Sequence, residues 1–368
     1  MTGSSSRRSQ EHHRPVDPPI SRKVARFASG AKLRVIDLFA GCGGISLGFQ
    51  RAGYEIRAAV EIDELAARSH AINFLRGADA DRIEHHARPR DITRIDPGEI
   101  AEDFDLGTIE DGVDVLVGGP SCQAYARVGR AKLREVAEHP EAYRVDPRGN
   151  LYLRYLTYVA AFKPLALMME NVPDILRYGG HNVVQEMVEA LDSIGYDARY
   201  SLINSAFHGV PQMRDRVFLL AYRKELGIRV RFPKATHYMI LPPGYDSTRA
   251  FALRFVDLLD GLAHSEPNLG GPHLPFPVTA SEAIGDLPPI TIHLEGKLPT
   301  GARRFTELTR YDNRRQVSAY AKSLREWPGF EDGTGIRDHV IRNLPRDTDI
   351  FRQMEPGSEY PAAHAVAT

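Results

Sequence analysis

The sequence predicts an α/β protein built on a doubly wound, mostly parallel sheet. Short apolar runs alternate with segments of helical periodicity, which is the order that produces βαβ units. Several apolar runs end in turns that contain glycine or proline, and polar side chains follow at those turns. In open α/β sheets, ligands bind at the carboxyl ends of the strands. A chain of 368 residues with 42% hydrophobic content can bury such a core and carry a second, smaller part.

Each expected element follows from a local pattern. Apolar runs bounded by turn-forming residues predict strands at 33–38, 56–62, 113–117 and 165–169. Apolar positions at helical spacing predict helices at 45–52, 64–74, 151–162 and 182–194. The runs 200–203 and 217–222 then flank Gly209-Val210-Pro211, which is typical of an antiparallel pair at the end of a sheet.

Three regions are expected along the chain. Residues 1–30 are rich in Ser, Arg, His and Pro without an apolar period, so we expect a disordered polar tail. Residues 31–223 carry the strand and helix pattern and form the main domain. Prolines recur over 224–368 and helical periodicity becomes patchy, which indicates an irregular second region.

Composition places the protein in the cytoplasm. The two cysteines lie in separate glycine-containing turns, so a disulfide framework is not expected. No apolar stretch approaches the roughly eighteen residues that span a bilayer. No metal site is predicted. Net charge is −1, yet arginines cluster near 127–134, 303–315 and 337–352, where they form either solvated surface or a local phosphate-binding face.

Cys122 is the candidate nucleophile. It follows the apolar run 113–117 in the turn Gly118-Gly119-Pro120-Ser121-Cys122-Gln123, so a rigid elbow presents it at the carboxyl edge of the sheet. Glu170 is delivered to the same edge by the run 165–169 and is a candidate acid. Arg214 and Arg216 are two residues apart in an extended segment and should share one face, although a pair of surface charges would look the same.

A nucleoside cofactor is indicated by the first strand and turn. Asp37-Leu38-Phe39-Ala40-Gly41-Cys42-Gly43-Gly44 supplies glycines where the backbone must turn tightly and approach a ligand. Glu61 ends the next strand about twenty residues on, where a carboxylate can accept both hydroxyls of a ribose. A dinucleotide would favour glycine at Ser46, whereas S-adenosylmethionine lacks phosphates and tolerates a looser turn.

Four stretches together carry a resemblance to a known family. Residues 37–41, Pro120-Ser121-Cys122-Gln123, Glu170-Asn171-Val172 and Gln212-Met213-Arg214-Asp215-Arg216 occur in the order of the DNA (cytosine-5)-methyltransferase motifs, and the chain resembles that family over about residues 32–222. Asp91-Ile92-Thr93 resembles the third motif, residues 146–151 the fifth, and residues 279–288 the segment after the eighth.

The resemblance implies a Rossmann-like methyltransferase fold, S-adenosylmethionine as cofactor and duplex DNA as substrate. It assigns attack on cytosine C6 to Cys122, a proton at N3 to Glu170, the base O2 to Arg216 and a supporting role to Arg214. It places cofactor contacts at the following residues: Phe39, Gly41, Gly43, Gly44, Ile45, Glu61, Ile62, Asp91, Ile92 and Leu151.

Two departures from the family pattern leave alternatives open. Ser121 stands where proline normally precedes the nucleophile, and the stiffening effect of proline is lost there. The late recognition and Gly-Asn motifs are not found, so the target-recognition domain is expected to be incomplete. The chain could be one subunit of a split methyltransferase in restriction-modification, a decayed homologue, or a non-catalytic DNA- or partner-binding protein. A tRNA methyltransferase is a further alternative.

Overall fold

The computed structural model describes residues 17–121, 151–254, 256, 263–289, 308–329, 333–337, 350 and 353–354. The chain divides into two compact units. The first comprises Met1–His208 and Arg214–Pro275, and the second comprises Gly209–Met213 and Phe276–Thr368. The boundary expected near residue 223 therefore falls inside the first unit, because the proline-rich stretch up to Pro275 belongs with the sheet.

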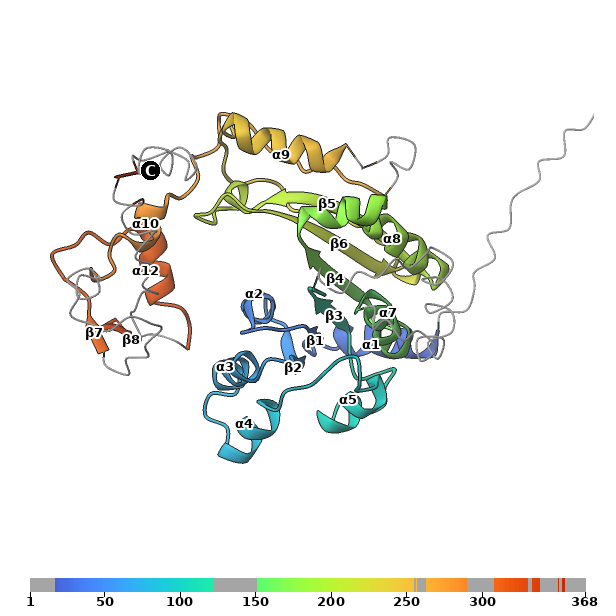
Figure 1. Ribbon diagram of the computed structural model, residues 1–368. Helices are drawn as coiled ribbons and strands as arrows, with labels where there is room; N and C mark the ends of the chain where they lie inside the picture. Colours follow the sequence, from blue (N-terminus) through green and yellow to red (C-terminus); the bar gives the residue numbers. More distant parts are fainter. Residues whose placement is uncertain are drawn as a thin grey trace, which may run out of the picture. The chain divides into compact units, whose positions relative to one another are not determined.

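The first unit is built around a six-stranded sheet with the strand order β2-β1-β3-β4-β6-β5 (Figure 1). The strands are β1 (Arg34–Leu38), β2 (Glu55–Val60), β3 (Val115–Gly118), β4 (Ala166–Asn171), β5 (Tyr196–Asn204) and β6 (Asp215–Arg223). The strands β2, β1, β3 and β4 run parallel, and β6 pairs antiparallel with both β4 and β5. The predicted α/β fold with a closing antiparallel pair is confirmed.

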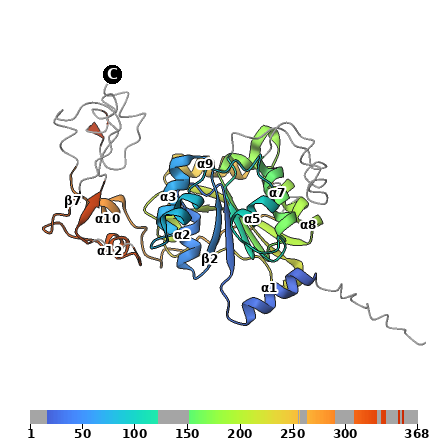
Figure 2. The same cartoon turned by 90° about the horizontal axis from the view of Figure 1, so that it is seen from below.

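Helices cover both faces of this sheet (Figure 2). The helices are α2 (Gly44–Arg51), α3 (Glu64–Phe74), α4 (Ala80–His86), α5 (Pro97–Asp103), α7 (Leu151–Phe162), α8 (Val183–Ser193) and α9 (Pro243–Leu253). Successive side chains of a strand point to opposite faces, so Val35 packs toward α2 while Ile36 joins the larger core with α5, α7 and α8. The sheet is thus buried on both sides, which explains its nearly continuous apolar strands.

Side-chain caps fix where several helices begin. Asp63 accepts from the backbone N–H of Ala66 at 2.8 Å at the start of α3, and Asn182 accepts from that of Gln185 at 3.1 Å before α8. Short 3-10 segments follow β4, β5 and β6 at Pro173–Gly180, Ser205–His208 and Lys224–Leu226. These local signals start α3 and α8 directly after the turns that leave the sheet edge.

The disordered tail expected over 1–30 is corrected for part of its length. Residues Pro18–Ala28 form helix α1, and Ile20 is fully buried. Lys23 is also buried, and its ammonium donates to the carbonyl oxygens of Phe162 and Lys163, both at 2.8 Å, at the end of α7. The helix is held by these long-range contacts, which a search for apolar periodicity does not detect.

The second unit contains short elements in its described part. They are α10 (Ala280–Ile284), β7 (Leu308–Arg310), α12 (Ala319–Arg325) and β8 (Gly335–Arg337), with β7 and β8 paired antiparallel. Arg325 joins them, because its guanidinium pairs with the buried Asp286 and lies 3.4 Å from the ring centroid of Tyr311. In neither unit does the described part contain a helix long and apolar enough to cross a bilayer.

Candidate active site

A cavity of about 500 Å³ lies at the carboxyl ends of β1 and β2. It is lined by Phe39, Val60, Glu61, Ile62, Arg90, Asp91, Ile92, Thr93, Gly119, Ser121 and Leu151. Six of the ten predicted cofactor residues are among them, from four separate segments of the chain: Phe39, Glu61, Ile62, Asp91, Ile92 and Leu151. The fold therefore gathers into one pocket residues from four separate segments that the family resemblance assigned to the cofactor.

Glu61 is held in place by three backbone N–H groups. Its Oε2 accepts from Gly41 at 2.8 Å, and its Oε1 accepts from Ile62 and Asp63, both at 2.8 Å. Gly41 has φ +55°, a left-handed conformation that suits glycine. A carboxylate offers about four acceptor positions, so Glu61 fixes the glycine turn and keeps one acceptor position for a ligand in the cavity.

The glycine turn brings β1 close to α3. Phe39 has φ +62°, which is uncommon for a residue with a Cβ and is typical of strain stored at functional sites. Gly43 has φ +96°, and a Cβ there would lie 2.4 Å from the ring of Phe74. Gly44 and Ile45 begin α2, and Ile45 packs beneath the sheet against the Val35 cluster. The turn residues 41, 43, 44 and 45 thus shape the site without lining the cavity.

The far wall of the cavity is a braced turn. The Oδ1 of Asp91 accepts from the backbone N–H of Thr93 at 2.9 Å and from its hydroxyl at 2.7 Å. Arg90 is almost fully buried and anchors to Asp103, with Nη2 2.6 Å from the Oδ2 of that carboxylate. Arg154 in α7 donates to the carbonyl of Ile92. The turn that carries the predicted cofactor contacts Asp91 and Ile92 therefore sits on a fixed support.

Glu170 is the last residue but one of β4 and pairs with Arg216, whose Nε lies 2.7 Å from Glu170 Oε1. Arg216 belongs to β6, whereas Arg214 precedes that strand and is exposed. Burial raises the pKa of the Glu170 carboxyl, and the charge of Arg214 opposes that rise. The structure brings the three predicted residues together, with Arg216 in direct contact with the carboxylate and Arg214 acting at longer range.

The base of the Cys122 loop lies beside this pair. A Cβ on Gly119 would sit 3.1 Å from Glu170 Oε2. The Nδ2 of Asn171 donates to the carbonyl of Pro120 at 2.7 Å and contacts the Tyr152 hydroxyl at 2.8 Å. Cys122 itself lies outside the described residues. Gly119 and Ser121 also line the cavity, so the loop joins the acid to the cofactor side.

The comparison with protein families agrees with this geometry. A model of the C-5 cytosine-specific DNA methylase family matches residues 33–286. The chain belongs to this family. The match covers the sheet, the cavity and the Glu170–Arg216 pair.

The chain is similar to individual proteins of the family, and the matched region covers a different share of each. A protein of Oceanobacillus iheyensis named as a type II methyltransferase is 33% identical over 340 residues, which are 90% of this chain and 69% of the relative. The type II methyltransferase M.NgoPII of Neisseria gonorrhoeae is 31% identical over 204 residues, which are 55% of this chain and 52% of the relative.

Two further matches concern a shorter relative and a solved structure. The type II methyltransferase M.AquIA of Picosynechococcus is 32% identical over 212 residues, which make up 55% of this chain and 77% of that protein. A solved E. coli prophage protein, described as a DNA modification methyltransferase, has a TM-score of 0.49 and 23% identity, covering 79% of this chain and 64% of its own.

Asn171 is a site residue that the sequence analysis left without a role. It is 5% exposed, and besides holding Pro120 it accepts from the backbone N–H of Val172 through Oδ1 at 2.9 Å. An amide at this place can satisfy a carbonyl, a hydroxyl and an N–H at once. The sequence signal for its role was its position directly after Glu170. A residue next to a functional residue at a strand end lies close to the same loop.

Asn171→Ala is expected to lower methyl transfer about 10- to 100-fold in kcat, because the loop that carries Cys122 loses its anchor to β4. Leaving the buried Pro120 carbonyl unpaired should also cost about 1–3 kcal/mol of stability. Kinetics and urea unfolding of the variant measure both effects.

Asn182→Ala is the matched control for this prediction. It removes the cap of α8 and should cost about 1 kcal/mol of stability while methyl transfer per folded molecule stays unchanged. Equal losses of kcat in the two variants would show that Asn171 matters only for folding.

Proposed function

We propose that this chain transfers a methyl group from S-adenosylmethionine to C5 of cytosine in duplex DNA. The observation that carries the proposal is the continuity of the site: one cavity is lined by six of the predicted cofactor residues and by Gly119 and Ser121 at the base of the Cys122 loop. Glu170 lies against the same loop at Gly119. A methyl donor in that cavity would be next to the proposed nucleophile and acid.

The residues of the cavity suit S-adenosylmethionine. A volume of about 500 Å³ lies in the ordinary range for small-molecule sites. Glu61 would accept hydroxyls of the ribose, Phe39 would cover the adenine, and the Asp91–Thr93 turn would flank it. The cofactor supplies an activated methyl group when bound. Gly119 and Ser121 mark the side of the cavity from which the acceptor would approach.

Three side chains would activate the base. Cytosine C5 is a weak nucleophile until a thiolate adds to C6, and Cys122 would supply that thiolate. Glu170 would hold a proton at N3, which its raised pKa favours. Arg216, which now pairs with Glu170, would turn toward the base O2 when cytosine enters. Because these atoms are hidden inside a duplex, the base must first leave the stack.

A second polypeptide that supplies target recognition is part of the proposal. The matched region makes up 77% of M.AquIA but only about half of M.NgoPII, so methyltransferase chains of this family differ in how much they add to the catalytic part. The second unit of the chain would then meet the partner or the DNA. We place the activity within restriction-modification in the cytoplasm.

Bisulfite sequencing tests the proposal directly. The chain is expressed, alone and together with the reading frame next to its gene, in a bacterial host that lacks cytosine methylation. Conversion-resistant cytosines at one defined sequence are expected in the co-expressing cells, and S-adenosylmethionine binding is measured by calorimetry on the purified protein.

The outcomes separate the alternatives. Methylation by the chain alone would remove the need for a second polypeptide. Cofactor binding without methylation in either arm would favour a non-catalytic DNA- or partner-binding protein. Loss of both cofactor binding and methylation would favour a decayed homologue and would overturn the proposal.

A further inference from the structure

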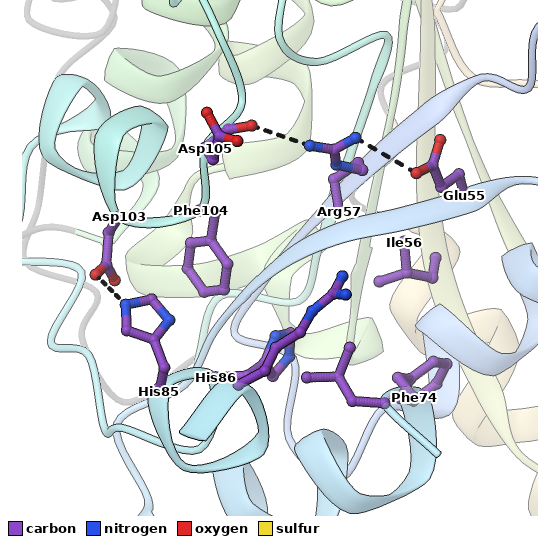
Figure 3. Close-up of a pocket in the computed structure, with 11 residues that line it drawn as sticks. Glu55, Ile56, Arg57, Phe74, His85, His86, Asp103, Phe104 and Asp105 are labelled. Atoms are coloured by element: carbon purple, nitrogen blue, oxygen red, sulfur yellow. Dashed lines mark hydrogen bonds and ion pairs between the residues drawn. The ribbon is translucent and has the colours of Figure 1, made fainter. Parts of the chain in front are cut away.

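A second cavity, of about 430 Å³, lies between α4, the start of β2 and the ends of α3 and α5. Its lining includes Arg57 from β2, Phe74 from α3, His86 from α4 and Phe104 after α5 (Figure 3). His86 is 8% exposed, and its ring packs edge-on to Phe104 with centroids 5.3 Å apart. Arg90 lies over the same Phe104 ring at 4.3 Å. This α4 cavity is the outer end of a buried polar chain.

A buried series of side-chain hydrogen bonds runs from the α4 cavity to β1. The Nε2 of His86 is 3.1 Å from the Nδ1 of His70, and the Nε2 of His70 is 3.1 Å from the Ser46 hydroxyl. Ser46 in turn lies 2.6 Å from the Oδ2 of Asp37. Asp37, Ser46 and His70 are each 0–1% exposed, so no water competes for these bonds.

The hydrogen bonds that link His86, His70, Ser46 and Asp37 can all point in either of two directions, and the number of protons on the four groups decides which. Burial lowers the pKa of His70 to about 3 and of His86 to about 4, so each ring is neutral and carries one N–H. When Asp37 is ionised it can only accept, so Ser46 donates to it and His70 donates to Ser46. When Asp37 is protonated it can donate to Ser46, and every bond of the chain can reverse. The charge of Asp37 and the direction of the chain are therefore linked.

Asp37 occupies an apolar position of β1, on the same face as Val35 and α2. Among the described residues, its Oδ1 has no hydrogen-bond partner. Around it, α2 contributes Ser46 and the residue after β2 is Glu61, while Tyr155 of α7, on the other face of the sheet, interacts with Asp37 electrostatically. Burial and the charge of Glu61 raise the pKa of Asp37 to about 7, and the Ser46 hydrogen bond opposes that rise.

We propose that Asp37 makes the cofactor cavity select the methyl donor, with its positively charged sulfur, over the demethylated product, whose sulfur is uncharged, and that Ser46 and His70 are positioning residues that set the pH at which this selection begins. The inference rests on the proposed function. S-Adenosylmethionine carries one more positive charge than S-adenosylhomocysteine, on its sulfur. An anion buried two residues before Phe39 attracts that extra charge, whereas a neutral Asp37 does not.

The direction of the pH effect follows from the sign of the charge. Below about pH 7 Asp37 holds a proton and adds no attraction, and above that pH it is ionised. The affinity ratio of donor to product should therefore rise with pH. Asp37 is two residues from Phe39 and interacts electrostatically with Glu61, and both of these residues line the cavity. At an effective dielectric of about 20, two unit charges roughly 10 Å apart change an equilibrium constant on the order of tenfold. Product would then leave more readily than donor at the upper end of the range.

Calorimetry with both ligands between pH 5.5 and 8.5, on the purified full chain, tests the inference. In the unmodified protein the ratio of the two affinities should rise on the order of tenfold. In Asp37→Asn the ratio should stay flat and low. In Ser46→Ala the rise should move to higher pH, because the hydroxyl that stabilises the ionised form is gone. Taking the ratio cancels pH effects on the protein that act equally on both ligands, and Asp37→Asn accounts for titration of the ligands themselves.

Glu64→Gln is the matched control, because Glu64 is exposed at the start of α3 and loses the same charge from the same region. This variant should keep the rise of the ratio. Infrared difference spectra of the ligand-free protein should also show a protonated carboxyl that titrates near pH 7 and is missing in Asp37→Asn. Binding of both ligands with a constant ratio would overturn the inference and leave the proposed function standing. If neither ligand binds at any pH, both fail.

Discussion

Replacing Cys122 with alanine is expected to abolish methylation, lowering the rate by at least about 10⁴-fold in the assembled enzyme. Cytosine C5 becomes nucleophilic only after a group adds to C6, and among the described residues that line the cavity none carries a thiol that could supply that addition. Glu170 and Arg216 would still bind the base, so DNA affinity should change far less than the rate. The methylation rate is measured as product formation on a defined duplex, and the DNA affinity is measured by gel shift.

Cys42→Ala is the matched control for this prediction. Cys42 is the other cysteine of the chain and is exposed in the glycine turn beside the cofactor cavity. Alanine fills the turn equally well, so this variant should retain most of its activity. DNA with fluorine at cytosine C5 adds a second readout, since fluorine cannot leave as a proton does, and the adduct should persist on gels in all variants except Cys122→Ala. Methylation retained by Cys122→Ala would rule out the covalent mechanism.

The carboxyl edge of the sheet could be predicted from the sequence because the residues that define it are neighbours in the chain. Runs such as 113–117 and 165–169 are short, apolar and directly followed by glycine or by a polar residue, so both the strand and the functional position can be read from a few neighbours. Phe39 and Glu61 were predicted from two separate turns, whereas Asp91 was assigned by the family resemblance. They meet because parallel strands end at one edge.

The features that sequence reasoning missed depend on contacts between distant segments. Helix α1 was assigned to a tail because its anchor is Lys23, whose partners lie about 140 residues away. The His70–His86 pair joins two helices, and neither histidine differs locally from a surface residue. His86 precedes a turn with two arginines, Arg88 and Arg90, and such a charged turn would predict an exposed position. Only the packed fold shows that these groups are buried and paired.

Gly118→Ala is expected to destabilise the protein by about 3 kcal/mol or more, the upper range for inserting an extra methyl into a packed core. A Cβ at this position would lie 2.4 Å from the carbonyl oxygen of Leu38, which is backbone and cannot turn away. Gly118 pairs with Leu38 on one side and with Met169 on the other, so β3 cannot shift without disturbing both neighbours. Urea unfolding of the purified variant measures the loss.

Gly48→Ala is the matched control and should have the opposite sign. Gly48 lies inside α2 with open space around the added methyl, so alanine should stabilise the helix by about 0.5–1 kcal/mol. A loss in Gly118→Ala no larger than about 1 kcal/mol would mean that the sheet can widen there.

The tight contact at Gly118 has a functional consequence. Leu38 leads into Phe39 and the cofactor turn, while Gly118 leads into Gly119, Pro120 and the loop of Cys122. Neighbouring parallel strands bring these two turns together, and the missing side chain at Gly118 lets the backbones approach as closely as the sheet allows. Any residue larger than glycine would separate the methyl donor side from the nucleophile side. The glycine thus keeps the Phe39 turn and the base of the Cys122 loop close together, and a surviving Gly118→Ala protein should bind cofactor yet transfer methyl slowly.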